Sequence, residues 1–242
     1  MKTLTGFHAV TSRLRQRPET IREIYVDAER SDARAKDLKR AAKAANVRVI
    51  PVDGKRLDGM AGGTRHQGVV AQAEPLKMPQ FIDDALEGLT EQPLLLILDG
   101  VQDPHNLGAC LRVADGAGAH AVIAPKDRSV GLTTAAIKVS SGASESVPYI
   151  VVTNLARTLR DLKDRGIWLI GADDSAPQTI YQAKLEGPLG LVLGAEGEGL
   201  RRLTKDSCDG LVSIPMLGSV ESLNVSVASG ICLYEARRRR MG

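Results

Sequence analysis

The sequence predicts an α/β protein, and three observations support this class. Short apolar segments with strand character alternate with helical patterns along most of the chain, as in proteins built around a parallel sheet. Residues 94–100, LLLILDG, are almost purely apolar, which is typical of a central parallel strand covered on both faces. The 242 residues are enough for one large or two small domains with their own cores.

The first lobe is expected to be a small α/β unit without a Gly-rich phosphate loop. Glycine and basic residues are frequent between residues 52 and 69, so we expect a loop there. Arg56, Arg65 and His66 on this loop could contact a nucleic acid backbone, or the loop could simply be mobile. In this lobe we expect helices at residues 9–16 and 32–46 and strands at residues 21–26, 47–52 and 68–73.

The second lobe follows residues 74–80, EPLKMPQ, whose two prolines are typical of a linker. Asn106 is expected to cap a helix at residues 107–116, and residues 154–165 have the pattern of an amphipathic helix. The serine-rich residues 139–146 are expected to form a helix end and a turn. Further strands are expected at residues 94–100, 121–125, 167–172, 189–194 and 211–214.

The last expected strand leads through a turn and a polar tripeptide into a C-terminal helix. Four apolar residues at helical spacing predict one face of this helix, namely Leu223, Val227, Ile231 and Tyr234. Four arginines at residues 237–240 lie in its last turn, where positive charge suits the helix dipole. A polar connection between the end of a strand and the N-terminus of a helix often forms a small-molecule site. An ordinary strand-to-helix connection has the same sequence pattern.

Charge is distributed unevenly between the two lobes. Residues 1–77 contain 16 Lys and Arg and 9 Asp and Glu, whereas residues 78–242 contain 16 and 20. The positive first lobe predicts contact with a polyanion such as RNA or DNA, and the alternative is ordinary solvated helix surfaces. Because only 3% of residues are aromatic, base stacking is not the expected mode of recognition.

Composition and motifs argue against a membrane protein, a disulfide-stabilised protein, a hydrolase and a metalloenzyme. No apolar run approaches the length of a membrane span and no signal pattern is present, so a cytoplasmic protein without membrane contact is expected. The three scattered cysteines favour reduced thiols. Because GxSxG and HExxH are absent and the four histidines are isolated, we expect no metal site and no catalytic histidine.

Three loops follow strand ends, at residues 99–112, 194–199 and 216–224. Ligands of open α/β sheets collect at the carboxyl ends of strands, so these loops could share one pocket. The middle loop, GAEGEG, lacks the GxGxxG spacing, and Glu196 and Glu198 would repel a pyrophosphate. This argues against an NAD-dependent oxidoreductase and favours a neutral or cationic ligand.

The segments LDGVQDPHNLGACLRVADGAGAHAVI, LVLGAEGEGL and IPMLGSVESLNVSVASGICLYEA stand in this order at the expected strand ends. Together they resemble the three motifs of the SpoU (TrmH-type) branch of the SPOUT methyltransferases. GFHAV near the start and HQGVVA at the end of the first lobe extend the resemblance over nearly the whole chain. The resemblance is closest to members that methylate a guanosine 2′-hydroxyl in the P loop of the peptidyl transferase centre of 23S rRNA.

The resemblance implies a SPOUT domain whose parallel sheet contains a deep trefoil knot, an exception to the usual topology rules. It also implies a homodimer formed around the knot and a small ribosomal-protein-like RNA-binding domain in the first lobe. The expected domains are residues 1–74 and 92–242, joined by a linker at residues 75–91. S-adenosyl-L-methionine is the implied cofactor and 23S rRNA the implied substrate.

The family motifs also imply site residues. Three positions are expected to line the cofactor site, namely Gly194, Ile214 and Leu223. Five positions match functional polar residues, namely Asn106, Arg112, Glu196, Ser222 and Asn224. A ribose 2′-hydroxyl needs help to lose or polarise its proton, and an arginine stays charged. We therefore expect Arg112 to anchor phosphate and stabilise the alkoxide, with a general base as the alternative.

The remaining polar positions have less specific expected roles. Ser222 and Asn224 could orient the hydroxyl or the loop backbone, and Glu196 could hold its loop or lie near the cationic cofactor. Capping and turn chemistry is the alternative for Glu196 and Asn224. For the whole protein, the alternatives are a tRNA ribose as substrate and a non-catalytic RNA-binding or ribosome-assembly factor.

Overall fold

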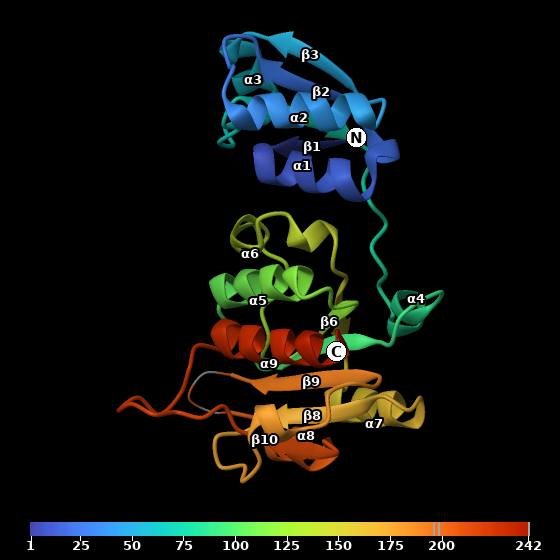
Figure 1. The fold of residues 1–242 in the computed structure, drawn as a ribbon, viewed down its shortest axis with the longest axis vertical. Helices are drawn as coiled ribbons and strands as arrows, with labels where there is room; N and C mark the ends of the chain where they lie inside the picture. The colour runs from blue at the N-terminus through green and yellow to red at the C-terminus, as the bar shows by residue number, and fades with distance from the viewer. Residues whose placement is uncertain (196, 198, 242) are drawn as a thin grey trace. The chain divides into compact units, whose positions relative to one another are not determined.

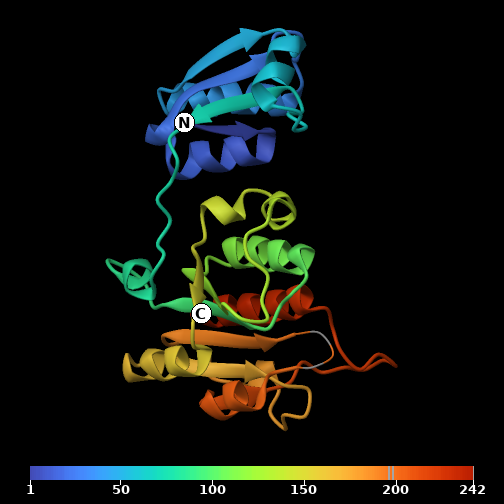
Figure 2. The same cartoon turned by 180° about the vertical axis from the view of Figure 1, so that it is seen from behind.

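The structure is a computed structural model, which describes residues 1–195, 197 and 199–241 (Figures 1 and 2). The chain divides into two compact units, Met1–Lys77 and Met78–Gly242. Each unit has its own sheet and its own buried apolar clusters. The α/β class predicted from the alternation of strands and helices is confirmed.

The first unit is built on a four-stranded mixed sheet in the order β1-β4-β2-β3. Its strands are β1 (Lys2–Thr5), β2 (Ile21–Asp27), β3 (Arg48–Val52) and β4 (Val69–Ala73). Its helices are α1 (Phe7–Gln16), α2 (Ala33–Ala44), α3 (Gly54–Ala61) and the 3₁₀ turn η1 (Pro18–Thr20). Helices α1 and α2 cover one face of the sheet, and on the other face Leu57 of α3 packs with Tyr25 of β2 and Val70 of β4.

Helix α3 corrects the expectation of a loop between residues 52 and 69. The carboxylate of Asp53 accepts a hydrogen bond of 2.8 Å from the backbone N–H of Arg56 and caps the helix. Gly62, at φ 56°, ends it in the left-handed region. His66 is also held, because its Nε2 lies 2.9 Å from Asp58 and its Nδ1 accepts from the Gly68 N–H at 3.0 Å. The glycines thus mark a helix end.

The second unit is built on a six-stranded sheet in the order β10-β8-β9-β5-β6-β7, with every neighbouring pair parallel. Every residue of β5 is buried, which confirms the central strand predicted from its apolar run. The trefoil knot stays a prediction. The strands are β5 (Leu94–Asp99), β6 (Ala121–Pro125), β7 (Tyr149–Val152), β8 (Trp168–Ala172), β9 (Leu189–Gly194) and β10 (Gly210–Val212).

Helices cover both faces of this sheet (Figure 1). On one face lie α5 (Pro104–Gly116) and α9 (Val225–Arg240), with α6 (Thr134–Val139) packed against α5. The other face carries α4 (Ile82–Leu86), α7 (Leu155–Asp164) and α8 (Arg202–Ser207). Two 3₁₀ turns complete the unit, η2 (Ala143–Glu145) and η3 (Ile180–Gln182). The helix end and turn expected at residues 139–146 are confirmed by α6 and η2.

Helix α5 begins three residues earlier than expected. Asp103, rather than Asn106, is its N-cap, and its carboxylate accepts from the His105 N–H at 2.6 Å. Pro104 occupies the first helical position, where its fixed φ and missing N–H are favourable. Asn106 therefore lies inside the first turn, and its side chain is available for a contact outside the helix.

Helix α9 packs on the core through a different face from the apolar one read from the sequence. Val227 and Tyr234 are 50% and 54% exposed, whereas Ser229, Cys232 and Leu233 are fully buried. The hydroxyl of Ser229 donates to its own helix, to the Val225 carbonyl at 2.7 Å, so its burial leaves no polar group unpaired. An apolar pattern could not reveal a core face that contains a serine.

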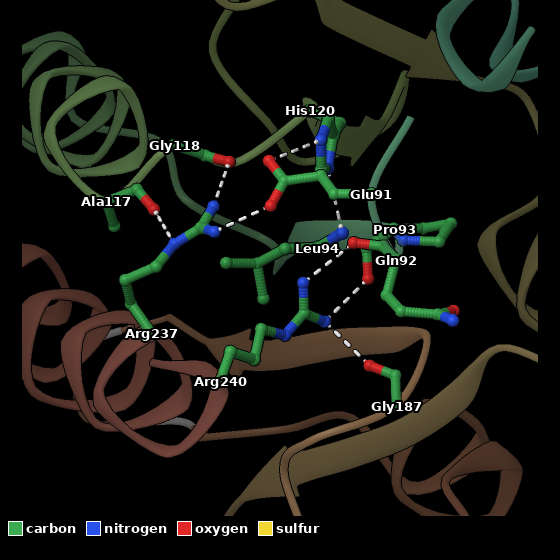
Figure 3. A network of polar contacts seen from close by, with 10 residues as sticks. All are labelled: Glu91, Gln92, Pro93, Leu94, Ala117, Gly118, His120, Gly187, Arg237 and Arg240. Carbon is green, nitrogen blue, oxygen red and sulfur yellow. Dashed lines mark hydrogen bonds and ion pairs between the residues drawn. The ribbon is translucent and has the colours of Figure 1, made fainter. Parts of the chain in front are cut away.

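Two of the four C-terminal arginines fasten α9 to the chain around the start of β5 (Figure 3). Arg237 donates three hydrogen bonds of 2.8 Å, to the carbonyl oxygens of Ala117 and Gly118 and to the Glu91 carboxylate. Arg240 donates to the carbonyl oxygens of Gln92 at 2.7 Å, Pro93 at 2.8 Å and Gly187 at 2.6 Å. Their charges therefore act inside the unit, in addition to favouring the helix dipole.

His120 belongs to the same network and makes stability depend on pH. Its Nδ1 accepts from the Leu94 N–H at 2.9 Å, and burial, aided by Arg237, lowers its pKa against the opposing attraction of Glu91. The pKa of a histidine in the unfolded chain is about 6.5, so as the pH falls the unfolded state takes up a proton before the folded state does. As the pH falls below about 6.5, we therefore expect the free energy of unfolding to decrease. The decrease should end below the pKa of His120 in the folded protein.

Urea unfolding at about pH 7.5 and about pH 5.5 measures this loss. His120→Gln is expected to remove the histidine part of the pH dependence, whereas the exposed His105→Gln should retain it. Equal pH dependence in the wild type and in His120→Gln would show that another group is responsible.

Candidate functional site

A cavity of about 470 Å³ lies where the carboxyl ends of β8, β9 and β10 meet the start of α9. The three positions expected to line a cofactor site all border it. Gly194 ends β9, Ile214 follows β10, and Leu223 precedes α9. Ser222 borders the same cavity. The structure therefore brings two of the three loops together at one edge of the parallel sheet, where ligands of such sheets bind.

Gly194 occupies a position that no other residue fits. A Cβ atom there would lie 2.0 Å from the carbonyl carbon and 2.1 Å from the carbonyl oxygen of Gly199. The chain turns back at this point, and the Gly199 N–H donates to the Ala195 carbonyl at 3.0 Å. The close approach of backbone to backbone closes one wall of the cavity. Glu196, in the same segment, lies outside the described residues.

An ion pair with a buried carboxylate forms just after Gly199 and Leu200. The Asp99 side chain is fully buried at the end of β5, and it accepts from Arg201 through Nε at 2.6 Å and through the backbone N–H at 3.1 Å. Arg201 immediately precedes α8. The sequence motifs predicted no role for Asp99, although a carboxylate at the end of an apolar strand was a visible signal.

The cavity carries more carboxylates than cations among its described lining residues. Asp173, Asp174 and Glu221 border it, together with Lys205. Lys205 lies 2.7 Å from Asp173. Burial raises the pKa of Asp173, but the hydrogen bonds from Lys205 and Ser175 outweigh it, so this pKa is lowered overall. The carboxylate stays ionised at neutral pH, and the lining suits a ligand with a positive group.

The first of the three loops reaches the site through a contact between Asn106 and Asn224. Asn224 Nδ2 donates to Asn106 Oδ1 at 2.9 Å and joins the N-termini of α5 and α9. Asn224 is also the N-cap of α9, since its Oδ1 accepts from the N–H and the hydroxyl of Ser226 at 2.9 and 2.6 Å. The capping alternative for Asn224 is therefore correct, and it does not replace the contact with Asn106.

Arg112 lies apart from the cavity lining. It is exposed on α5, six residues after Asn106, which corresponds to about 9 Å along a helix axis. No described residue forms an ion pair with it. An exposed guanidinium without a carboxylate partner can accept a phosphate or another anion from outside the chain.

Other kinds of site are not found in the described part of the chain. None of its helices combines the length and apolar character needed to cross a membrane. No three His, Cys, Asp or Glu residues in it are grouped so as to hold a metal ion. Burial raises the pKa of Cys208 and of Cys232 to about 12, so these thiols stay protonated and are poor nucleophiles.

Two family models match the chain. Residues 93–234 match the SpoU rRNA Methylase family, and residues 3–79 match the model described as RNA 2′-O ribose methyltransferase substrate binding. Among solved structures, an RNA 2′-O ribose methyltransferase superposes with a TM-score of 0.72 at 27% identity, over 99% of this chain and 89% of that one. The SpoU methyltransferase AviRb from Streptomyces viridochromogenes, in complex with AdoMet, gives 0.71 at 25% identity, over 99% and 90%.

Curated proteins are similar over the full length. The 23S rRNA (guanosine-2′-O-)-methyltransferase RlmB of Ralstonia nicotianae is 65% identical over 239 residues, which are 99% of this chain and 96% of that protein. The protein of the same name from Bordetella pertussis is 58% identical over 241 residues, 100% and 98% of the two chains. With the cavity at the strand ends and the match of the SpoU model to more than half of its residues, this chain belongs to the SpoU rRNA methylase family.

Proposed function

We propose that this protein transfers a methyl group from S-adenosyl-L-methionine to the 2′-hydroxyl of a guanosine ribose in 23S rRNA. The observation that carries the proposal is a ligand-sized cavity at converging strand ends in a chain 65% identical to the Ralstonia 23S rRNA (guanosine-2′-O-)-methyltransferase. We place the modified guanosine in the P loop of the peptidyl transferase centre, and the reaction in the cytoplasm.

The cavity fits the cofactor in size and chemistry. A volume of about 470 Å³ lies in the range of small-molecule sites. Ile214 and Leu223 supply apolar walls, the backbone at Gly194 approaches without a side chain, and the carboxylates match a cation. When bound, S-adenosyl-L-methionine supplies a methyl group on a positively charged sulfur. The AviRb structure contains this cofactor.

In this proposal, the polar residues position the ribose and its developing charge. Ser222 at the cavity, with the Asn106–Asn224 pair beside it, orients the hydroxyl and the loop backbone. Arg112 binds a neighbouring phosphate and stabilises negative charge on the ribose oxygen as its proton passes to water. Positioning supplies much of the rate because methyl transfer is an in-line displacement. A guanidinium that stays charged at neutral pH is a poor general base.

In this proposal the first unit binds RNA and the second unit transfers the methyl group. We assign residues 1–74 to RNA binding and residues 92–242 to catalysis, with residues 75–91 as the linker. The net positive charge of residues 1–77 and the substrate-binding model over residues 3–79 support this assignment.

A second copy of the chain completes the assembly in this proposal. The exposed apolar face of α9, with Val227 and Tyr234, is the kind of surface that a partner covers. Sedimentation equilibrium is expected to give twice the mass of one chain, and Val227→Asp with Tyr234→Asp should shift the mass toward one. A wild-type protein with the mass of a single chain would contradict the homodimer.

Mass spectrometry of rRNA from cells with and without this protein tests the function. We expect one 2′-O-methylguanosine in the P loop to disappear without the protein and to return with a plasmid copy. Loss of a methylated tRNA ribose instead would support the tRNA alternative. A purified protein without measurable S-adenosyl-L-methionine binding by calorimetry would support the non-catalytic RNA-binding factor.

A further inference from the structure

A second cavity, of about 500 Å³, lies in the first unit between α2 and the strand β3. Its lining combines three apolar residues, Val47, Val49 and Pro51, with three cationic ones, Lys39, Lys43 and Arg48. We call this cavity the α2–β3 groove. None of its described lining residues is aromatic, so it offers no platform for stacked bases.

Two of the three cations that line the groove, Lys39 and Lys43, have no carboxylate partner among the described residues, whereas Arg48 is paired with Glu23 at 3.3 Å. Lys36, Lys39 and Lys43 lie at i, i+3 and i+7 and so project from one side of α2. No described carboxylate forms an ion pair with Lys39 or Lys43. Arg40, by contrast, is paired with Asp37 at 2.8 Å. Uncompensated lysines at a concave surface attract phosphate groups.

The groove also lies along an open sheet edge. Strand β3 is the last strand of its sheet, so one side of its backbone has no strand partner. Pro51, without an N–H, discourages pairing with another protein strand on that side. An extended polymer can therefore lie along β3 without meeting another strand of the unit. The absence of stacking residues and the lysine spacing fit a sugar–phosphate backbone.

We propose that the α2–β3 groove holds a segment of the RNA substrate, with Lys39 and Lys43 each contacting a phosphate. The proposal rests on the RNA methyltransferase function above and names the surface that binds the substrate. It assigns RNA contact to one face of the first unit. The basic residues of the opposite side, on and after α3, have no part in it.

Fluorescence anisotropy with a 23S rRNA fragment that contains the P-loop hairpin tests this surface in the full-length protein. Lys39→Gln with Lys43→Gln is expected to weaken binding roughly 10- to 30-fold at about 0.15 M salt, as the loss of two counterion-releasing contacts requires. The slope of log K against log salt should become smaller by about 1.5–2. Lys39→Arg with Lys43→Arg should keep both values.

The matched control is Lys55→Gln with Arg65→Gln, which removes the same charge from α3 and the segment after it. This control is expected to bind RNA within about twofold of the wild type, because salt screens exposed charges that lie away from the contact surface. Equal losses in both double variants would mean that overall charge explains RNA binding, and the groove proposal would be wrong. Wild-type affinity and slope in Lys39→Gln with Lys43→Gln would also overturn it.

Calorimetry with S-adenosyl-L-methionine on the same samples separates this proposal from the proposed function. Cofactor affinity should be unchanged in every groove variant, which also shows that the protein is folded. A wild type that binds RNA through the groove but binds no cofactor would overturn the methyltransferase function and leave the groove assignment intact.

Discussion

Replacing Arg112 by alanine is expected to lower the methylation rate constant roughly 100- to 1,000-fold, the usual effect of removing one group that stabilises developing charge. The affinity for S-adenosyl-L-methionine should not change, because Arg112 does not border the cavity. Single-turnover methylation of a 23S rRNA fragment measures the rate, and calorimetry measures cofactor binding. Arg112→Lys should recover only part of the rate, since lysine has a charge but no bidentate fork.

A matched control is Arg157→Ala on α7. Arg157 is also an exposed helical arginine, and it has only a loose ion pair of 4.0 Å with Asp161. This variant is expected to methylate at the wild-type rate. Full activity of Arg112→Ala with unchanged cofactor affinity would remove Arg112 from the proposed mechanism and leave the cavity assignment standing.

Replacing Gly194 by alanine is expected to weaken cofactor binding roughly 100-fold. The new methyl group would overlap the backbone of Gly199, at 2.0 Å from its carbonyl carbon. A backbone cannot rotate away as a side chain can. The free-energy cost of the overlap therefore lies at the upper end of the range for overpacked residues, about 3 kcal/mol. We expect the backbone at Gly199 to move away and relieve the overlap, so that cofactor binding must restore it against this free energy, which corresponds to roughly a 100-fold change in affinity. Calorimetry measures the affinity, and urea unfolding measures the accompanying loss of stability.

Gly218→Ala is the control for a change from glycine to alanine near the same cavity. A Cβ at Gly218 would meet nothing within 4 Å, and the residue lies in the segment between β10 and α9. Its effect on the free energy of unfolding should stay within about 0.5 kcal/mol. If Gly194→Ala binds the cofactor as the wild type does, the close approach of Gly199 to Gly194 does not form a wall of the site.

The features that the sequence alone could reveal are local ones. The apolar run of β5 indicated a central strand because burial on both faces requires side chains of one kind, and all of its residues are buried. The polar loops after β9 and before α9 were recognisable for another reason. Each follows a strand, and the carboxyl ends of parallel strands share one edge of the sheet. By contrast, the sequence did not predict α3. The helix is short and rich in glycine, and the glycine that ends it, Gly62, indicated a loop instead.

Contacts between distant parts of the chain were decided only by the tertiary structure. Asn106 meets Asn224 across 118 residues, and Asp99 meets Arg201 across 102. The order of the strands, which no local pattern encodes, brings these pairs together. The packing of α9 was decided in the same way, because the buried side of a helix depends on its neighbours. A satisfied hydroxyl such as that of Ser229 can enter the core, while Val227 and Tyr234 stay outside.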